Sequence, residues 1–365
     1  QMPGKSTNDS RRTMGILNAI SLRLGLKDKF DRRSYSESGT LLITSIIVGI
    51  GAGLGAVVFL WLLEKVQEIS LNPEGIFKSI APYHIILVPA IGGLIAGPII
   101  YFFAQEAKGH GVPSVMEAVA VKGGRIRPQV AFVKVIASAI TIGTGGSAGS
   151  EGPIAQIGAG LGSTIGQIFH LSEDQVRTLV ACGAGGGIAA IFHAPIGGAI
   201  FAMEVVLGRL HTMYFGVVVI SSVVASVVAQ IFQQSTTIFS VPSYELISPW
   251  ELLFYAILGL LAAFGSLLFS RTLDIFETVS DRMRLPEYIK PMLGGLLLGV
   301  AGFLTYKIDG IPRIFDGGYS TISQTLFGEL TLKVALVLLF LKMLATNLTL
   351  GSGGSGGIFA PTLFM

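Results

Sequence analysis

Charged residues are scarce in this sequence. Asp, Glu, Lys and Arg make up 13% of its 365 residues, whereas a soluble globular domain carries about 25%. Apolar residues make up 51%, and the mean hydropathy is +0.70. Because so few charges cannot cover the water-facing surface of a protein of this size, the composition excludes an ordinary soluble domain.

Cysteine is almost missing as well. The single cysteine, Cys182, excludes a disulfide within this sequence, and its apolar neighbours favour a small buried side chain over a reactive thiol. The first long apolar run begins only at residue 41, and no small-residue cleavage pattern follows it, so no signal peptide is recognised. No pattern in the sequence indicates a metal or an organic cofactor, and we expect neither.

Long apolar runs are abundant instead. A helix that crosses a bilayer needs roughly 20 residues. Residues 41–63 carry no charge, and residues 81–103 are interrupted only by the polar His84. Further spans are expected near residues 178–203, 213–232, 252–270, 291–306 and 334–350. We predict an all-α, multi-pass protein of the cell membrane, surrounded by the lipid bilayer.

Basic residues are concentrated at the start of the chain. Residues 1–38 hold eight Lys and Arg against four acids, while the net charge of the whole sequence is only +3. A short basic segment beside the first span favours the cytoplasmic side of a membrane. Within it, residues 16–26 are mildly amphipathic and suit a helix on the membrane surface. A nucleic-acid-binding arm is the alternative, but we expect no nucleic-acid partner beside a membrane span.

The sequence repeats itself at an offset of 208 residues. Residues 134–157 and 342–365 align without gaps and share nine identities in 24 positions. The identical pairs are Lys134/Lys342, Ala137/Ala345, Thr141/Thr349, Gly143/Gly351, Gly145/Gly353, Gly146/Gly354, Ser147/Ser355, Gly149/Gly357 and Pro153/Pro361. The aligned lysines and prolines are not explained by a bias towards glycine. The repeat predicts two copies of one membrane unit.

The repeat also suggests domain boundaries. We predict a basic segment over 1–38, a first membrane repeat over 39–210, and linker helices with an incomplete second repeat over 211–365. The first copy continues through residues 180–206, whose partner would fall near 388–414. We therefore expect this sequence to be part of a longer protein.

Glycine and proline interrupt both copies in the middle of apolar segments. Such paired interruptions point to the binding site of a membrane transporter, and irregular backbone is tolerated there only where it lines a cavity or packs on protein. Pro113, Pro153 and Pro361 each stand where a new helix would start. The free N–H groups and the positive dipole end at a helix start attract anions. The pattern therefore predicts an anion site.

Three motifs give the chain a resemblance to the CLC family of chloride channels and chloride/proton antiporters. GHGVP at 109–113 resembles the family's Gly-Ser-Gly-Ile-Pro, GSEGP at 149–153 its Gly-Arg-Glu-Gly-Pro, and GGIFAP at 356–361 its Gly-x-Phe-x-Pro. The resemblance covers nearly everything after about residue 40. It implies an inverted-repeat architecture with broken and re-entrant helices, and a homodimer with one pore in each subunit. An apolar interface near residues 188–207 would fit such a dimer.

The resemblance also implies roles for single residues. Glu151 corresponds to the gating glutamate, whose carboxylate blocks the path when ionised and leaves it when protonated. The alternative role, a carboxylate that complements a helix dipole, is compatible with the first. Lys134 lies in an apolar stretch, where it would raise the positive potential for anions or extend to the membrane interface. The expected anion-binding positions are His110, Gly111, Ser150, Glu151, Gly152, Ile358 and Phe359.

Three positions depart from the family pattern. His110 replaces the usual serine, so it would contact the anion through N–H, add charge at low pH, or leave the binding to backbone amides. Ser150 replaces an arginine. Val205 stands where many antiporters carry a proton-transferring glutamate, one residue after Glu204, which remains a candidate for the proton path. Because valine cannot carry a proton, the sequence favours a passive chloride channel, with chloride/proton antiport as the alternative.

An enzyme is the alternative from a different class of protein. Ser147 within GTGGSAG could act as a nucleophile with His193 as its base, which would make the chain an intramembrane serine hydrolase. The second repeat copies the serine as Ser355 but does not copy the histidine. No Gly-Lys-Ser/Thr pattern follows the glycines, which argues against a nucleotide-binding loop. We therefore expect a transport protein and not an enzyme.

Overall fold

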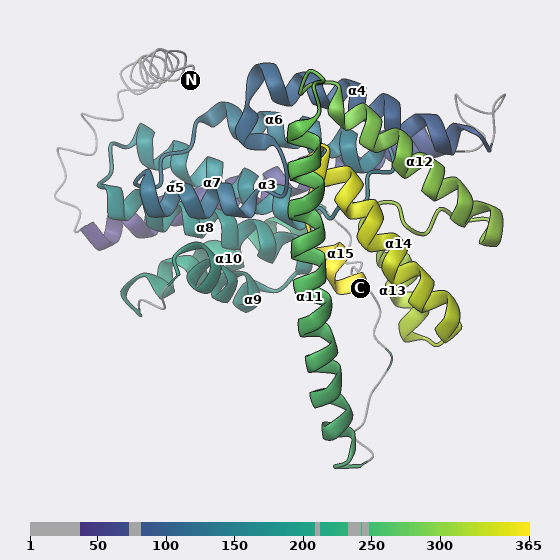
Figure 1. The fold of residues 1–365 in the computed structure, drawn as a ribbon. Coiled ribbons are helices and arrows are strands. Elements are labelled where there is room, and N and C mark those ends of the chain that lie inside the picture. Colours follow the sequence, from purple (N-terminus) through teal and green to yellow (C-terminus); the bar gives the residue numbers. More distant parts are fainter. Residues whose placement is uncertain (1–36, 73–81, 209–211, 233–241, 243–247) are drawn as a thin grey trace. The chain divides into compact units, whose positions relative to one another are not determined.

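The structure is a computed structural model that describes residues 37–72, 82–208, 212–232, 242 and 248–365 (Figure 1). The surface helix expected over residues 16–26 lies outside these ranges, as do residues 1–36 of the basic segment expected over 1–38. The described chain is helical, with two isolated β-bridges as its extended pairings. Seven of the described helices are long and apolar enough to cross a membrane. The all-α prediction is confirmed.

The order of helices reflects the sequence repeat. Two long helices, α3 and α11, each precede a 20-residue helix, a short helix, a helix that ends in glycine, and a helix that starts after a glycine-rich break. The first series is α3 (Glu37–Leu71), α4 (His84–Phe103), η2 (Gln105–Ala107), α5 (Val112–Val121), α6 (Pro128–Gly143) and α7 (Glu151–Ile168). The second is α11 (Glu251–Arg282), α12 (Lys290–Asp309), α13 (Tyr319–Leu326), α14 (Leu332–Gly351) and α15 (Phe359–Phe364). Between the two series lie α8 (Glu173–Phe192), α9 (Pro195–Phe201), η3 (Ala202–Val206) and α10 (Thr212–Phe232).

One expected span has other bounds in the structure. A span is expected near residues 178–203, but α8 covers Glu173–Phe192 and a new helix starts at Pro195. His193 takes the left-handed conformation, with φ of 52°, and closes the C-terminus of α8. The residue before a proline also disfavours helical geometry, and Ala194 occupies that position. Apolar composition alone does not indicate such a break in a helix.

The described residues pack into two compact units that are interleaved along the chain. Of the described residues, one unit holds those within 1–59, 111–135 and 153–236, and the other holds those within 60–110, 136–152 and 237–365. Both units draw on both halves of the sequence. The units describe packing and not repetition, so the repeat boundaries at 39–210 and 211–365 stay a prediction.

Small residues bring helices together in the first unit. A Cβ atom added to Gly158 of α7 or Gly183 of α8 would collide with the backbone of the other glycine. Gly49 of α3 also lies close to Ser221 of α10, at 2.6 Å from an added Cβ to the carbonyl oxygen. Inside a membrane, helices associate through such close backbone packing, because lipid is as apolar as leucine.

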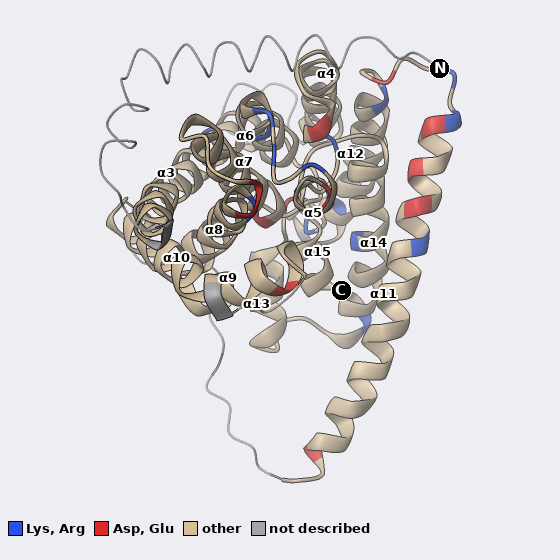
Figure 2. Ribbon diagram, turned by 90° about the vertical axis from the view of Figure 1, so that its left-hand side faces the viewer, with Lys and Arg blue, Asp and Glu red and all other residues tan. Residues whose placement is uncertain are grey.

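The second unit uses the same device between α4 and α12, which lie side by side (Figure 1). Gly93 of α4 faces the backbone of Pro291, and Gly295 of α12 faces the carbonyl of Pro89. Charged residues of α11 gather near its C-terminal end, while its stretch 252–270 has none (Figure 2). The close crossing of α4 and α12 fixes the helix ends that border the glycine-rich segments.

Candidate functional site

The glycine-rich segments are joined by backbone hydrogen bonds within the second unit. Gly149 and Gly357 each donate to the other's carbonyl, over 2.7 and 2.6 Å. The Gly109 N–H donates to the Gly354 carbonyl over 3.0 Å, and the Gly356 N–H donates to the Gly109 carbonyl over 3.3 Å. Segments that lie far apart in the sequence, and that were predicted to share a site, thus meet at one junction.

This junction has a local two-fold symmetry. Gly149 and Gly357 are equivalent under the 208-residue offset, and they pair with each other in antiparallel fashion. Other contacts occur in matched pairs that the same offset exchanges. These are Ser138···Ser355 (2.9 Å) with Ser147···Thr346 (3.1 Å), and Ser147 N to Thr349 Oγ1 (3.0 Å) with Ser355 N to Thr141 Oγ1 (3.4 Å). The two copies are therefore inverted relative to each other where they meet.

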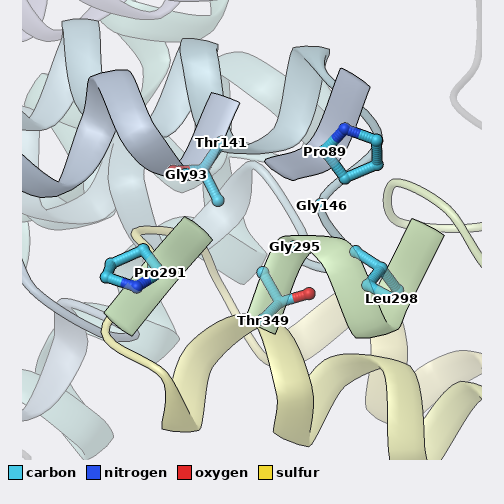
Figure 3. Close-up of a pocket in the computed structure, with 9 residues that line it drawn as sticks. Pro89, Gly93, Thr141, Gly146, Pro291, Gly295, Leu298 and Thr349 are labelled. Carbon is cyan, nitrogen blue, oxygen red and sulfur yellow. The ribbon is translucent and has the colours of Figure 1, made fainter. Parts of the chain in front are cut away.

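A small cavity lies between equivalent residues of the two copies (Figure 3). Thr141 and Thr349 line it as one equivalent pair, and Gly146 and Gly354 as another. Glycine and proline backbone from α4 and α12 completes the wall. The cavity volume of about 10 Å³ has room for no more than one water molecule. The junction is therefore packed tightly around its axis.

Glu151 is the first residue of α7, and its side chain is buried at this junction. The residue is 1% exposed, and neither carboxylate oxygen has a hydrogen-bond partner within the described part of the chain. The carboxylate lies against Gly149, where an added Cβ would collide with Oε2 and would come 3.0 Å from the Cβ of Ala360. The backbone N–H groups of Glu151 and Ala360 lie near enough to act on it electrostatically, without hydrogen-bond geometry.

The neighbouring predicted residues surround this carboxylate with backbone. A Cβ on Gly152 would collide with the carbonyl oxygen of His110 and would lie 3.0 Å from Gly357 Cα, so only glycine fits. Ser150 is buried, and the His110 residue is half-buried. Ile358 is the N-cap residue of α15. Phe359, the first residue of α15, is 51% exposed.

The remaining predicted residues belong to the first unit. Gly111 is the N-cap of α5 and has φ of 84°, a conformation that favours glycine. Lys134 of α6 is completely buried, which argues against a side chain that extends to the membrane interface. Glu204 is exposed and Val205 is half-buried. Both lie in the π-helical turn η3, where successive side chains are rotated about the helix axis by a different angle than in an α-helix.

Sequence reasoning missed the structural importance of Lys342, the repeat partner of Lys134. Lys342 is completely buried in α14, and its Nζ donates to the carbonyls of Ile314, Phe315 and Asp316 over 3.1, 3.2 and 2.7 Å. The Nζ also lies 5.2 Å from the ring centre of Phe364. The aligned lysines were visible in the repeat, but nothing in the sequence indicated which carbonyls Lys342 would satisfy.

Comparisons with known proteins show the family of this chain. The family model described as "Voltage gated chloride channel" matches residues 92–365. A ClcB-like protein of Ralstonia nicotianae is 30% identical over 332 residues, which cover 89% of this chain and 76% of that protein. The H(+)/Cl(-) exchange transporter ClcA of Vibrio parahaemolyticus is 29% identical, over 89% of this chain and 70% of that one.

A solved structure supports the fold. The crystal structure of a slow cyanobacterial Cl-/H+ antiporter superposes with a TM-score of 0.74 at 24% identity, over 88% of this chain and 76% of that one. The family match extends over the junction of Gly149 and Gly357, the buried Glu151 and the start of α15. The chain belongs to the voltage-gated chloride channel (CLC) family.

Proposed function

We propose that this protein moves chloride across the membrane in exchange for protons, and that Glu151 is the group that both ions use. The observation that supports this most is the burial of the Glu151 carboxylate without a hydrogen-bond partner in the described chain. An isolated buried carboxylate is unfavourable, so its burial here favours a functional role for Glu151. A carboxylate at the start of a helix occupies the place that an anion would take.

The proposed gate works by competition between two anions. When Glu151 is ionised, its carboxylate rests at the start of α7, where the helix dipole stabilises negative charge. When it takes up a proton, that stabilisation is lost and the side chain swings out. Chloride then enters the same cradle, with backbone N–H groups of Ser150, Gly152, Ile358 and Phe359 as the proposed donors. The cradle needs no metal and no organic cofactor.

The exchange of protons is the finer part of the proposal. The sequence favoured a passive channel because Val205 cannot carry a proton. Relatives of similar identity include an H(+)/Cl(-) exchange transporter, which favours the alternative. Glu204 supports it further, since it is exposed and lies in a π-helical turn, a feature frequent at functional sites. In this proposal, Glu204 accepts protons from the inner solution and Glu151 accepts them from the outer one.

The proposal is tested with the purified protein in liposomes. An outward chloride gradient should drive protons against an opposing proton gradient, as measured by a pH electrode outside weakly buffered vesicles. Glu151→Gln should abolish the proton movement while chloride still flows. Glu204→Gln should slow it, and Glu117→Gln, at an exposed carboxylate paired with Lys122, serves as the control.

The same experiment decides for or against the second candidate, passive conduction. Val205 is the observation that favours it, because no proton carrier stands at that position. A reversal potential fixed at the chloride equilibrium value, whatever the pH gradient, would establish the channel and overturn the exchange. His110→Ser is measured alongside, since loss of proton movement in that variant but not in Glu204→Gln would assign the proton path to His110.

Several wider features belong to the same proposal. We expect a homodimer of subunits with separate pores, placed in the cell membrane with the N-terminus in the cytoplasm. The rival hydrolase finds no support at Ser147, whose hydroxyl is buried and bonded to Thr346 over 3.1 Å. A serine nucleophile needs a base at that distance, and threonine does not serve as one.

A further inference from the structure

A second, larger pocket lies within the second unit, and no residue proposed to bind chloride lines it. Its volume is about 190 Å³. Its walls come from the end of α4, the short η2 helix, the segment before α12 and the turn after α14. The lining residues are Gly97, Ile100, Tyr101, Gln105, Lys108, Glu287, Lys290, Pro291, Ser352 and Gly353.

Lys290, the first residue of α12, is the buried charge of this pocket. It is 5% exposed, and within the described part of the chain no hydrogen bond or ion pair reaches its side chain. Most of the side chain is covered, and its Nζ stays open to the pocket. An ammonium group has three N–H donors, and in this protein they are available to an acceptor that enters the pocket.

The other charged groups around the pocket are more exposed than Lys290. Lys108 Nζ lies 3.7 Å from Asp281 Oδ1, and both side chains are well exposed, at 43% and 65%, so this pair is weak. Glu277 of α11 also faces Lys108. Glu287 lines the pocket as an exposed carboxylate. Two lysines thus compete for an acceptor, while carboxylates at the exposed side limit how much negative charge the pocket tolerates.

The surroundings of the pocket are typical of a membrane surface. It adjoins the end of α4 and the start of α12, two helices long and apolar enough to cross a bilayer. Tyr101, Phe102 and Tyr288 form an aromatic cluster there, with ring centres 5.1 to 5.9 Å apart. Aromatic side chains of this kind gather at the level of lipid headgroups, and basic pockets between membrane helices bind acidic headgroups.

We propose that this pocket holds a singly charged phosphate ester, with Lys290 as its principal donor and Lys108 as a second. The volume is more than ten times the roughly 10–15 Å³ that one water needs by the same measure, so a monatomic anion would leave it mostly unfilled. A phosphodiester presents several acceptor oxygens to the two lysines. Glu287 disfavours a doubly charged phosphate. The ester is either the headgroup of a phospholipid or a soluble compound.

The first arm of the test counts bound phosphatidylglycerol on the purified, detergent-solubilised protein by native mass spectrometry. Loss of a hydrogen bond to a charged group weakens binding by about tenfold or more. Lys290→Met should therefore need an about tenfold higher phosphatidylglycerol concentration than the wild type to reach the same occupancy. Lys290→Arg should keep it. Lys307→Met, at an exposed lysine near the other end of α12, is the matched control and should match the wild type.

The second arm uses only the wild type, so it decides the matter even if Lys290→Met fails to assemble. Phosphatidylglycerol is compared with a galactolipid that has the same acyl chains and no phosphate. Equal retention of both lipids would overturn the proposal, as would equal retention of phosphatidylglycerol by Lys290→Met and Lys307→Met.

The third arm distinguishes the two sources of the ester. Glycerophosphoglycerol and inorganic phosphate are added as soluble competitors to wild-type protein loaded with phosphatidylglycerol. Displacement by glycerophosphoglycerol at millimolar concentration identifies a soluble ester as a ligand, whereas no displacement identifies the membrane lipid. Stronger displacement by inorganic phosphate, which is partly doubly charged at neutral pH, would contradict the role given to Glu287. Binding alone is measured, so the result is independent of the proposed chloride exchange.

Discussion

The two copies of the repeat have nearly the same backbone at their junction but different side chains at its centre. Gly149 and Gly357 occupy equivalent positions and bond to each other. Two residues further on, the first copy carries Glu151 and the second carries Phe359. Glu151 is buried without a partner in the described chain, whereas Phe359 is half-exposed at the start of α15. Equivalent positions of the two inverted copies therefore carry an ionisable carboxyl group in one copy and an aromatic ring in the other.

This difference separates what the backbone does from what the side chains do. Both copies break a helix with glycine and expose N–H groups, so the attraction for an anion comes from the duplicated backbone. Only one copy adds a titratable group. A duplicated frame can thus supply a symmetric cradle, while a single substitution makes it respond to protons. Substitutions in the duplicated backbone and in single side chains test these two contributions separately.

The largest effect is expected from breaking the backbone symmetry at Gly152. Its equivalent, Ala360, carries a Cβ atom without difficulty, but a Cβ on Gly152 would collide with the His110 carbonyl. Overpacking of this kind costs about 3 kcal/mol, so Gly152→Ala should sharply reduce the yield of assembled protein and its melting temperature. Gly259→Ala in α11, where an added Cβ meets nothing within 4 Å, is the control and should leave both unchanged. Equal stability of the two variants would mean that the junction is not tightly packed.

The next effect is expected at the paired lysines. Lys342→Met would leave the buried carbonyls of Ile314, Phe315 and Asp316 without their common donor. Buried groups that lose their hydrogen-bond donor are destabilising, so this variant should unfold at a lower temperature than the wild type in a thermal aggregation assay. Lys134→Met should instead lower chloride affinity, measured by calorimetry, with less loss of assembled protein. The reverse outcome, a stable Lys342→Met and an unstable Lys134→Met, would exchange the structural and electrostatic roles.

A purely functional effect is expected from Glu151→Gln. The amide keeps the shape of the side chain but cannot be ionised, so it no longer competes with chloride for the cradle. Chloride efflux from liposomes should become independent of external pH between 4.5 and 7.5, whereas the wild type should transport faster at the acid end. Protein yield should not change. A variant that keeps the pH response of the wild type would remove Glu151 from the gate.

The smallest effect is expected at Phe359, the partner of Glu151 in the other copy. If its backbone N–H binds the anion and its ring does not, Phe359→Leu should leave chloride efflux within about twofold of the wild type. The same assay and vesicles serve as for Glu151→Gln. A loss of tenfold or more would show that the ring itself shapes the path, and that the two copies differ in more than charge.

Much of the fold follows from the sequence because bilayers impose simple demands on composition. A run such as 41–63 has to be a membrane helix, since an apolar segment of that length has no other stable state in lipid. The 208-residue offset likewise carries over to the structure, where it exchanges matched hydrogen bonds. The span expected at 178–203 is interrupted in the structure. The break between α8 and α9 depends on the conformation of His193 and Ala194 and not on apolarity.

The sequence by itself determined the membrane helices, the duplication and the identity of the residues that gather at the junction. Only the tertiary structure decided which of them touch. The contact between Gly152 and the His110 carbonyl, the isolation of the Glu151 carboxylate and the three carbonyls bonded to Lys342 all join segments far apart in the chain. Such contacts depend on backbone distances between helices, and local patterns of residues do not encode those distances.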